Sequence, residues 1–299
     1  MIRLIAFDLD GTLLNQEKKV DPVTKDALNR LAEQGVFLIP ATGRTYGGCR
    51  GVLEGLQGIP YVITCNGAGI YDWQTKQCVH RDCMELEDYL PLLAELDQLS
   101  LMADSFVDGG AYMNAAKKPM IERLNVNQET KDYIYSSRTI VKDQVATLKE
   151  RGIPVEKLTV NFMENEKGQR IDYEQAWEIL RKYPAFNPVS GGMKNIEVTK
   201  KGVSKKTGLA WVGKQLGVSP EEMMALGDSG NDVDMLRYAG LGIAMGNAEE
   251  MAVEAADETT GSNTENGIAM ALKKHEREII NGKRHERIKN GSCYDASFY

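Results

Sequence analysis

The chain has 299 residues, of which 42% are hydrophobic, and it carries a formal net charge of −7 at pH 7. At roughly 150 residues per domain, this length predicts two domains. The acidic balance argues against a nucleic-acid-binding protein, whose surface would be basic. No apolar run approaches the ~20 residues that a membrane span requires. We therefore expect neither nucleic acid nor a membrane among its partners.

The cysteines and the N-terminus point to a cytoplasmic protein. The five cysteines are odd in number and contain no Cys-x-x-Cys pair, which is typical of a reducing compartment. The N-terminus lacks the basic and apolar segments of a secretory signal. The only histidines, His80, His275 and His285, stand at no apparent site, which disfavours a zinc centre or a Ser-His-Asp triad. Chemistry must come mainly from carboxylates, a lysine, hydroxyls and a bound metal.

The opening stretch, residues 2–14, organises the rest of the chain. It is a short apolar run that stops at Gly11, which predicts a strand buried on both faces. Asp8 and Asp10 stand at its carboxyl end, where open α/β sheets bind ligands, and their spacing puts them on one face. Two acids leaving a buried strand are costly unless a cation or a reacting group uses them. The alternative for so short a pattern is a pair of solvated turn aspartates.

Polar residues follow the next two expected strands. Strands are expected over residues 36–39 and 61–65, after a helix that starts at Asp21-Pro22 and stops at Gly35. A hydroxyl, a glycine and a cation just past a strand suit oxyanion binding. The residues concerned are Thr42, Gly43 and Arg44 after the first strand and Asn66 after the second. The alternation of strands and helices predicts a parallel sheet.

The pattern changes over residues 83–190, which we interpret as an inserted α+β domain with an antiparallel sheet open on one face. A hairpin precedes it, with strands 70–73 and 77–80. Strand 157–163 alternates as a half-exposed strand does. The remaining expected elements are helices 86–99 and 172–183 and strands 101–107, 111–114 and 196–199.

The parallel pattern returns after residue 201. Ser204 can cap a helix that runs to Leu216, which puts Lys205 in its first turn. A short apolar strand over 223–226 then leads into a second acidic segment containing Asp228 and Asp232. A strand over 241–245 and helices over 249–256 and 268–272 complete the pattern. The mixed-charge tail, residues 273–299, is expected to carry no site chemistry.

Four separated segments resemble the motifs of the haloacid dehalogenase superfamily of phosphohydrolases. In chain order they are Asp8-Leu9-Asp10-Gly11-Thr12, Ala41-Thr42-Gly43-Arg44, Gly202-Val203-Ser204-Lys205, and Gly227-Asp228-Ser229-Gly230-Asn231-Asp232. Each is moderately specific alone, but all four in this order, at strand ends or a helix start, are highly specific. The resemblance covers residues 1–272 and is in detail to the Cof-like subgroup with a type IIB cap. Lys206-Thr207 departs from the subgroup, which often has glycine after the lysine.

The resemblance implies a doubly wound, Rossmann-like α/β core with a parallel sheet, made of residues 1–82 and 191–272. It implies an inserted α+β cap at 83–190 and leaves 273–299 as a charged extension. The spacing agrees with this arrangement. About 30 residues separate Asp10 from Thr42, which is too few for a further domain. About 160 residues separate Arg44 from Lys205, which is enough for one, so the cap must lie between the second and third motifs.

The resemblance also implies an Mg²⁺-dependent phosphatase that hydrolyses small phosphorylated metabolites, such as sugar phosphates or phosphorylated cofactors, through an aspartyl-phosphate. Asp8 is then the nucleophile, and Asp10 exchanges protons with the leaving oxygen and with water. Asp8, Asp228 and the backbone carbonyl of Asp10 hold the Mg²⁺. The other implied roles are phosphate binding by Thr42, Gly43, Lys205 and Asn231, orientation of metal waters or Lys205 by Asp232, and substrate contact by Arg44 and Asn66.

Two alternatives remain open at this stage. A phosphomutase or phosphotransferase could use the same scaffold if water were held off and a sugar acceptor admitted. A non-catalytic metabolite sensor could keep the fold but would have no need of Asp10 or Lys205, and both are present. The identity of the substrate and the oligomeric state are not specified by these patterns.

Overall fold

The first of two main sheets is a five-stranded parallel sheet in the order β14-β13-β12-β1-β2. The computed structural model describes residues 1–191 and 195–279. The strands are β1 (Leu4–Phe7), β2 (Phe37–Pro40), β12 (Met223–Gly227), β13 (Leu241–Ala244) and β14 (Glu258–Thr259). β1 lies between β12 and β2 and is fully buried, as its run of apolar residues predicts.

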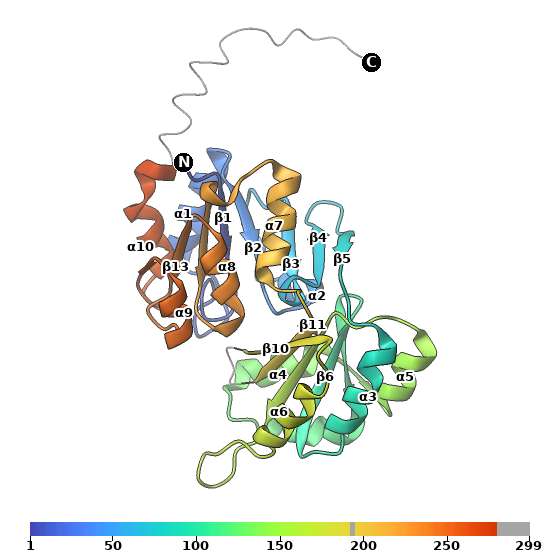
Figure 1. The fold of residues 1–299 in the computed structure, drawn as a ribbon. Coiled ribbons are helices and arrows are strands. Elements are labelled where there is room, and N and C mark those ends of the chain that lie inside the picture. The colour runs from blue at the N-terminus through green and yellow to red at the C-terminus, as the bar shows by residue number, and fades with distance from the viewer. Residues whose placement is uncertain (192–194, 280–299) are drawn as a thin grey trace, which may run out of the picture.

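Helices cover both faces of this core sheet (Figure 1). They are α1 (Pro22–Glu33), α2 (Tyr46–Cys49), α7 (Lys205–Leu216), α8 (Val233–Tyr238), α9 (Glu250–Ala255) and α10 (Gly267–Lys274). Alternate residues of β1 serve opposite faces. Ile5 and Phe7 pack in the cluster that contains residues of α1 and α10, whereas Leu4 and Ala6 pack with residues of α7, α8 and α9. The doubly wound α/β core is therefore present.

The expected third parallel strand is instead part of a small antiparallel sheet. β3 (Tyr61–Thr64), β4 (Gly69–Asp72) and β5 (Cys78–Arg81) pair in that order. Among the described residues, a single parallel bridge, between Ala41 just after β2 and Ile63, joins β3 to the core sheet. The chain reverses at once after β3 because Cys65 and Asn66 both adopt positive φ angles, 48° and 56°. The expected hairpin of residues 70–80 is confirmed as β4 and β5.

A second, six-stranded sheet has the order β10-β11-β9-β6-β7-β8 and is antiparallel except for the parallel pair β7–β8. Its strands are β6 (Leu101–Val107), β7 (Gly110–Asn114), β8 (Arg138–Val141), β9 (Lys157–Phe162), β10 (Phe186–Ser190) and β11 (Ile196–Lys200). Its helices are α3 (Leu86–Leu96), α4 (Gln128–Ser137), α5 (Gln144–Arg151) and α6 (Tyr173–Arg181). We call these elements the cap. The cap also contains the 3₁₀ segment η2 (Ala115–Arg123), and shorter 3₁₀ turns outside it are η1 (Cys65–Gly67), η3 (Pro220–Glu222) and η4 (Gly230–Asp232).

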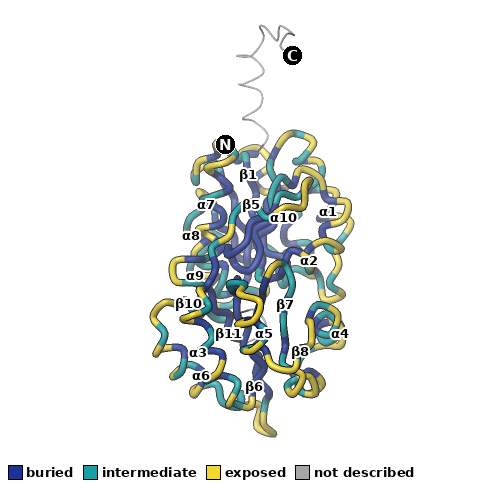
Figure 2. The backbone as a smooth tube through the Cα atoms, turned by 90° about the vertical axis from the view of Figure 1, so that its right-hand side faces the viewer, coloured by how far each residue is buried: buried dark blue, intermediate teal, exposed yellow. Residues whose placement is uncertain are grey.

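Two expectations about the cap are wrong. The division at 190/191 would separate β10 from β11, which pair from Phe186↔Lys200 to Ser190↔Ile196, so the cap sheet ends at Lys200. The strand that we expected to be half exposed, β9, is buried along its whole length. Figure 2 shows the same burial, in dark blue, along β1 of the core and β6 of the cap. Its alternate apolar residues pack in the cap's apolar cluster, while its polar residues, Lys157 and Thr159, line a cavity shared with the core.

The expected C-terminal extension, residues 273–299, is described only as far as residue 279. Ile279 is buried in the core cluster, and His275 bonds to Glu258 of β14. This first part of the extension therefore packs on the core. Residues 280–299 lie outside the described part of the chain. Within residues 1–191 and 195–279, no helix is long and apolar enough to cross a membrane.

Candidate active site

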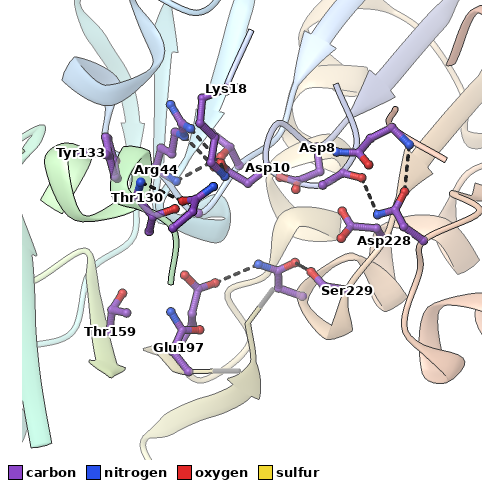
Figure 3. Close-up of a pocket in the computed structure, with 18 of the residues that line it drawn as sticks. Asp8, Asp10, Lys18, Arg44, Thr130, Tyr133, Thr159, Glu197, Asp228 and Ser229 are labelled. Carbon is purple, nitrogen blue, oxygen red and sulfur yellow. Dashed lines mark hydrogen bonds and ion pairs between the residues drawn. The ribbon is translucent and has the colours of Figure 1, made fainter. Parts of the chain in front are cut away.

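The predicted catalytic side chains meet at the carboxyl edge of the core sheet. Asp8 directly follows β1, Thr42 lies two residues after β2, and Asp228 directly follows β12. Parallel strands all end at this edge, which is why residues 220 positions apart in sequence come together there. All three line a cavity of about 390 Å³ that the core shares with the cap. Figure 3 shows Asp8 and Asp228 on one side of it and Thr159 and Glu197 on the other.

Lys205 is a fully buried cation between two carboxylates. It is the first residue of α7, whose start is fixed by Thr207 Oγ1 accepting a hydrogen bond from the Ser204 backbone N–H. Lys205 Nζ donates to Asp8 Oδ1 and to Asp232 Oδ1, both at 2.7 Å. Burial opposes its charge, but the charges of Asp232 and Asp8 outweigh burial and raise the pKa of Lys205. The ammonium is therefore permanently charged.

Asp8, Asp228 and Asp232 form a buried acidic cluster, with one carboxylate oxygen of each within 4.8 Å of the others. Burial raises the pKa of Asp8 to about 7, with the charge of Lys205 opposing the shift. Burial and then the charge of Asp8 raise the pKa of Asp228 to about 8. One lysine does not balance three carboxylates. The cluster has an excess of negative charge that a cation would relieve.

Asp232 already uses both carboxylate oxygens within the protein. Oδ1 accepts from Lys205, and Oδ2 accepts from the backbone N–H groups of Asp228 and Ser229 at 3.0 and 3.1 Å. It is the acidic partner of a capping box headed by Ser229. Asp232 thus orients Lys205 and shapes the loop that presents Asp228.

Asp10 turns away from the acidic cluster toward two cations. Arg44 donates to both of its carboxylate oxygens, at 2.6 and 2.8 Å, and Lys18 Nζ lies 2.7 Å from Oδ1. Although burial favours the neutral acid, the bonds and charge of Arg44 lower the pKa of Asp10 far below its usual range. Arg44, expected to contact substrate, lines the cavity but is committed to Asp10 in this conformation.

Thr42 and Gly43 lie where β2 leads into the cavity. Thr42 Oγ1 accepts a hydrogen bond from the Arg44 backbone N–H at 3.1 Å, so its hydroxyl proton is available to a ligand. A Cβ at Gly43 would lie 2.9 Å from both Glu197 Oε1 and Lys157 Nζ. The glycine is therefore needed for the close approach of the cap, a reason that the sequence did not indicate.

Glu197 of β11 joins the cap to the core and was not predicted as a site residue. Its Oε2 accepts from Asn66 Nδ2 at 2.7 Å and from Asn231 Nδ2 at 2.8 Å, and its Oε1 pairs with Lys157. Burial opposes ionisation, but Lys157 and the two amides lower the pKa of Glu197 to about 2. Asn66 is not among the residues that line the cavity. The sequence signal that could have identified Glu197 is a charged residue between the apolar residues Ile196 and Val198 of β11.

The acidic cluster fits a hard divalent cation. Lys205 occupies Oδ1 of Asp8, and Thr12 Oγ1 donates to Oδ1 of Asp228 at 2.8 Å. Among the described residues, the second oxygen of each carboxylate has no hydrogen-bond donor. Two carboxylate oxygens with raised proton affinity are the donor set that Mg²⁺ prefers. Both carboxylate oxygens of Asp232 already accept hydrogen bonds from the protein, so the side chains that fit the ion are those of Asp8 and Asp228.

We expect Gly11→Ala to disrupt this pair of carboxylates. Gly11 has a φ of +85°, and a Cβ there would lie 2.3 Å from Asp228 Oδ2. We expect displacement of this oxygen by about 1 Å to lower the kcat/KM of the reaction at this site on the order of 100-fold. Gly202→Ala is the matched control, because Gly202 has the same φ of +85° with nothing within 4 Å of its Cβ position. Equal losses in the two variants would show that backbone strain alone is responsible.

Comparison with known proteins agrees with the fold. A family model for haloacid dehalogenase-like hydrolases matches residues 5–272. The 5-amino-6-(5-phospho-D-ribitylamino)uracil phosphatase YcsE of Bacillus subtilis is 32% identical over 272 residues, 91% of this chain and 95% of YcsE. The pyridoxal phosphate phosphatase YbhA of Escherichia coli is 29% identical, covering 91% of this chain and 98% of YbhA.

Solved structures show the same architecture. A haloacid dehalogenase-like hydrolase from B. subtilis superimposes with a TM-score of 0.79 at 27% identity, covering 92% of this chain and 99% of its own. The subclass IIB sugar phosphatase BT4131 superimposes with a TM-score of 0.75 at 25% identity, with the same coverage. The chain belongs to the haloacid dehalogenase-like hydrolases. Within that family it is a Cof-like phosphatase with a type IIB cap, a hydrolase of phosphoric monoesters.

Proposed function

We propose that the protein is an Mg²⁺-dependent phosphatase of small phosphorylated metabolites and that Asp8 is its nucleophile. The observation that carries this proposal is the pair Asp8 and Asp228, each with a free carboxylate oxygen, beside the buried ammonium of Lys205. The pair lies at the strand ends where α/β proteins bind ligands, in a cavity that cap residues also line. Relatives named for ribitylaminouracil phosphate, pyridoxal phosphate and sugar phosphate support small phosphorylated substrates.

Each residue has a role that follows from its surroundings. Mg²⁺ bound by Asp8, Asp228 and the backbone carbonyl of Asp10 supplies the positive charge that lets a carboxylate approach a phosphoryl group. Asp8 attacks phosphorus in line, so that a bond to its carboxylate oxygen forms as the bond to the leaving oxygen breaks. Lys205 and the hydroxyl of Thr42 stabilise the phosphoryl oxygens. Asp232 holds Lys205 in place.

Asp10 must change partners to act as an acid. In the conformation described it is an ionised partner of Arg44 and Lys18, so it can accept a proton but has none to donate. Donation to the leaving oxygen requires the carboxylate to leave Arg44 once substrate is bound and to take up a proton from solvent, which it then passes on. Arg44 is then released to contact the phosphate or the leaving group. This exchange reconciles the expected substrate contact of Arg44 with its observed ion pair.

The raised pKa values of Asp8 and Asp228 predict how pH and Mg²⁺ affect stability. Without metal, the folded protein holds protons that the unfolded chain releases near pH 4, so stability falls as pH rises from about 4 to about 8. Mg²⁺ binds the ionised pair. The increase in Tm caused by Mg²⁺ should therefore be larger at pH 8 than at pH 6. An Mg²⁺ effect that is equal at both pH values, or that persists in Asp228→Asn, would contradict this assignment.

The proposed function is tested by a panel of phosphorylated metabolites assayed with and without Mg²⁺ and ranked by kcat/KM. We expect free phosphate in a one-to-one ratio with substrate consumed, and no transfer to added sugar. Transfer to sugar would favour the phosphomutase alternative. Failure to hydrolyse any phosphoester, p-nitrophenyl phosphate included, would overturn the proposal in favour of a non-catalytic protein.

A further inference from the structure

A single carboxylate oxygen of the cap accepts hydrogen bonds from two amides of the core. Oε2 of Glu197, on β11, accepts from Asn66 Nδ2 at 2.7 Å and from Asn231 Nδ2 at 2.8 Å. Asn231 Nδ2 also donates to Asn66 Oδ1 at 3.3 Å, so the three side chains are mutually bonded. Both hydrogens of the Asn231 amide are therefore used within the protein, and in this conformation it has none to donate to a phosphate.

The oxygen of the Asn231 amide is bonded to the loop that presents Asp228. Ser229 Oγ donates to Asn231 Oδ1 at 2.9 Å, and Ser229 directly follows Asp228. Figure 3 shows these hydrogen bonds running from Glu197 to Ser229 through the amide. The amide is thus held at its nitrogen by the cap and at its oxygen by the acidic loop. A contact made by the cap therefore constrains the residue next to Asp228.

Asn66 forms a second connection, to the loop after β2. Its backbone N–H donates to the Thr42 carbonyl at 3.0 Å. Its side chain is only 3% exposed and is not among the described residues that line the cavity. Asn66 can therefore influence a bound phosphate only through its neighbours, of which Thr42 is the one with a hydroxyl in the cavity. The Glu197 carboxylate thus connects to Thr42 and to the Asp228 loop through one intermediate residue each.

The Glu197 carboxylate is itself held by the cap. Lys157 of β9, which is 2% exposed, pairs with Oε1 and leaves Oε2 to the two core amides. Lys157 Nζ also lies 4.5 Å from the centroid of the Phe106 ring in β6. Because these contacts are all within the cap, the carboxylate must move with the cap. Any displacement of the cap from the core would leave both amides without their acceptor, which is unfavourable for buried groups.

We propose that Glu197 is a positioning residue that holds Asn66 and Asn231, and through them the loops of Thr42 and Asp228, in their reactive arrangement only while the cap contacts the core. Asn231 is then a link between cap and core and not a phosphate ligand. This inference rests on the proposed phosphatase function and adds to it a residue that acts through others. Loss of the acceptor should slow every phosphoester by the same factor, whatever its leaving group.

Two double variants isolate the acceptor from the ion pair. Lys157→Met with Glu197→Gln and Lys157→Met with Glu197→Leu both remove the two charges together, so neither leaves a buried charge alone. One oxygen accepts from both amides, so the glutamine oxygen can replace it, whereas leucine offers no acceptor. We expect kcat of the leucine form to be at least about tenfold below that of the glutamine form. The increase in Tm caused by Mg²⁺ with beryllium trifluoride, a phosphoryl mimic, should also be smaller in the leucine form.

The choice of substrates separates positioning from contact, since Glu197 itself lines the cavity. Initial rates are measured with p-nitrophenyl phosphate and with the best substrate of the metabolite panel. The ratio of the two kcat values should be the same in both double variants. A leucine form that loses activity on one substrate alone would overturn the inference, because Glu197 would then contact the leaving group. Equal kcat and equal Tm increases in the two double variants would also overturn it and leave Glu197 a purely structural role.

Asn66→Gly tests the relay from the core side and does not depend on whether the leucine form folds. Glycine keeps the backbone N–H that bonds to Thr42 and accepts the φ of 56°, so the change removes only the amide side chain. We expect kcat to fall about tenfold on both substrates. Lys76→Gly is the matched control, because Lys76 is exposed and has a φ of 64°; it should keep full activity. Parent-level kcat in Asn66→Gly would overturn the relay. Failure of the parent protein to hydrolyse any phosphoester would instead remove the proposed function.

Discussion

Asp8→Asn should lower kcat for every phosphoester by about 10³-fold or more, because the amide cannot form the covalent intermediate. The protein should nevertheless remain folded. Burial raises the pKa of Asp8 to about 7, which means that the site disfavours its ionised form and tolerates a neutral side chain of the same shape. The amide oxygen can still accept the hydrogen bond that Lys205 donates at 2.7 Å. Initial rates and a thermal melt on the same preparation check both expectations.

Asp26→Asn is the control for this variant, because Asp26 is exposed on α1. It makes the same chemical change away from the cavity and should retain full activity. Hydrolysis at the parent rate by Asp8→Asn would remove Asp8 as the nucleophile. A large fall in Tm would instead show that the ionised carboxylate is mainly structural.

Lys205→Met should have the largest effect on stability. The substitution keeps the apolar volume but leaves Asp8 and Asp232 buried without their shared cation. Removing one partner from a buried ion pair costs about 3–5 kcal/mol. Activity should also be lost, because no ammonium remains to stabilise the phosphoryl oxygens. Urea unfolding at pH 8 measures the first effect and initial rates measure the second.

The pH dependence separates the loss of this ion pair from a packing defect. At pH 5.5 the orphaned carboxyl groups can take up protons, so the stability deficit of Lys205→Met should be smaller than at pH 8. Lys206→Ala, at the next and exposed position of α7, should change neither stability nor activity by a comparable amount. A deficit that does not depend on pH would indicate that Lys205 contributes by packing alone.

The fold was largely predictable because the core follows local rules. The apolar run of β1, the acidic residues at the ends of β1 and β12, and the capped start of α7 are each readable from a few neighbouring residues. Parallel strands that end at one edge then place Asp8 beside Asp228. Local rules do not predict that Lys205 contacts both Asp8 and Asp232, because these contacts depend on packing between α7 and η4.

The cap was less predictable because its role depends on pairing between strands distant in sequence. Alternation along β9 predicted a side that faces solvent, but this side is buried. Of its polar residues, Lys157 pairs with Glu197, whereas Thr159 Oγ1 and Asn161 Nδ2 have no hydrogen-bond partner among the described residues. Glu197 was not predicted as a site residue because the amides that bond to it belong to Asn66 and Asn231, which are 131 and 34 residues away in sequence. The partner of Asp10 was likewise set by tertiary structure, since Arg44 lies 34 residues further along the chain.

A crystal structure with Mg²⁺ and beryllium trifluoride, a mimic of the phosphoryl group, would test the central claim most directly. The account predicts beryllium bonded to an Asp8 carboxylate oxygen and Mg²⁺ in contact with the carboxylates of both Asp8 and Asp228. Lys205 and Thr42 should contact the fluorines. Beryllium trifluoride on another residue, or a cation bound away from Asp8 and Asp228, would contradict it.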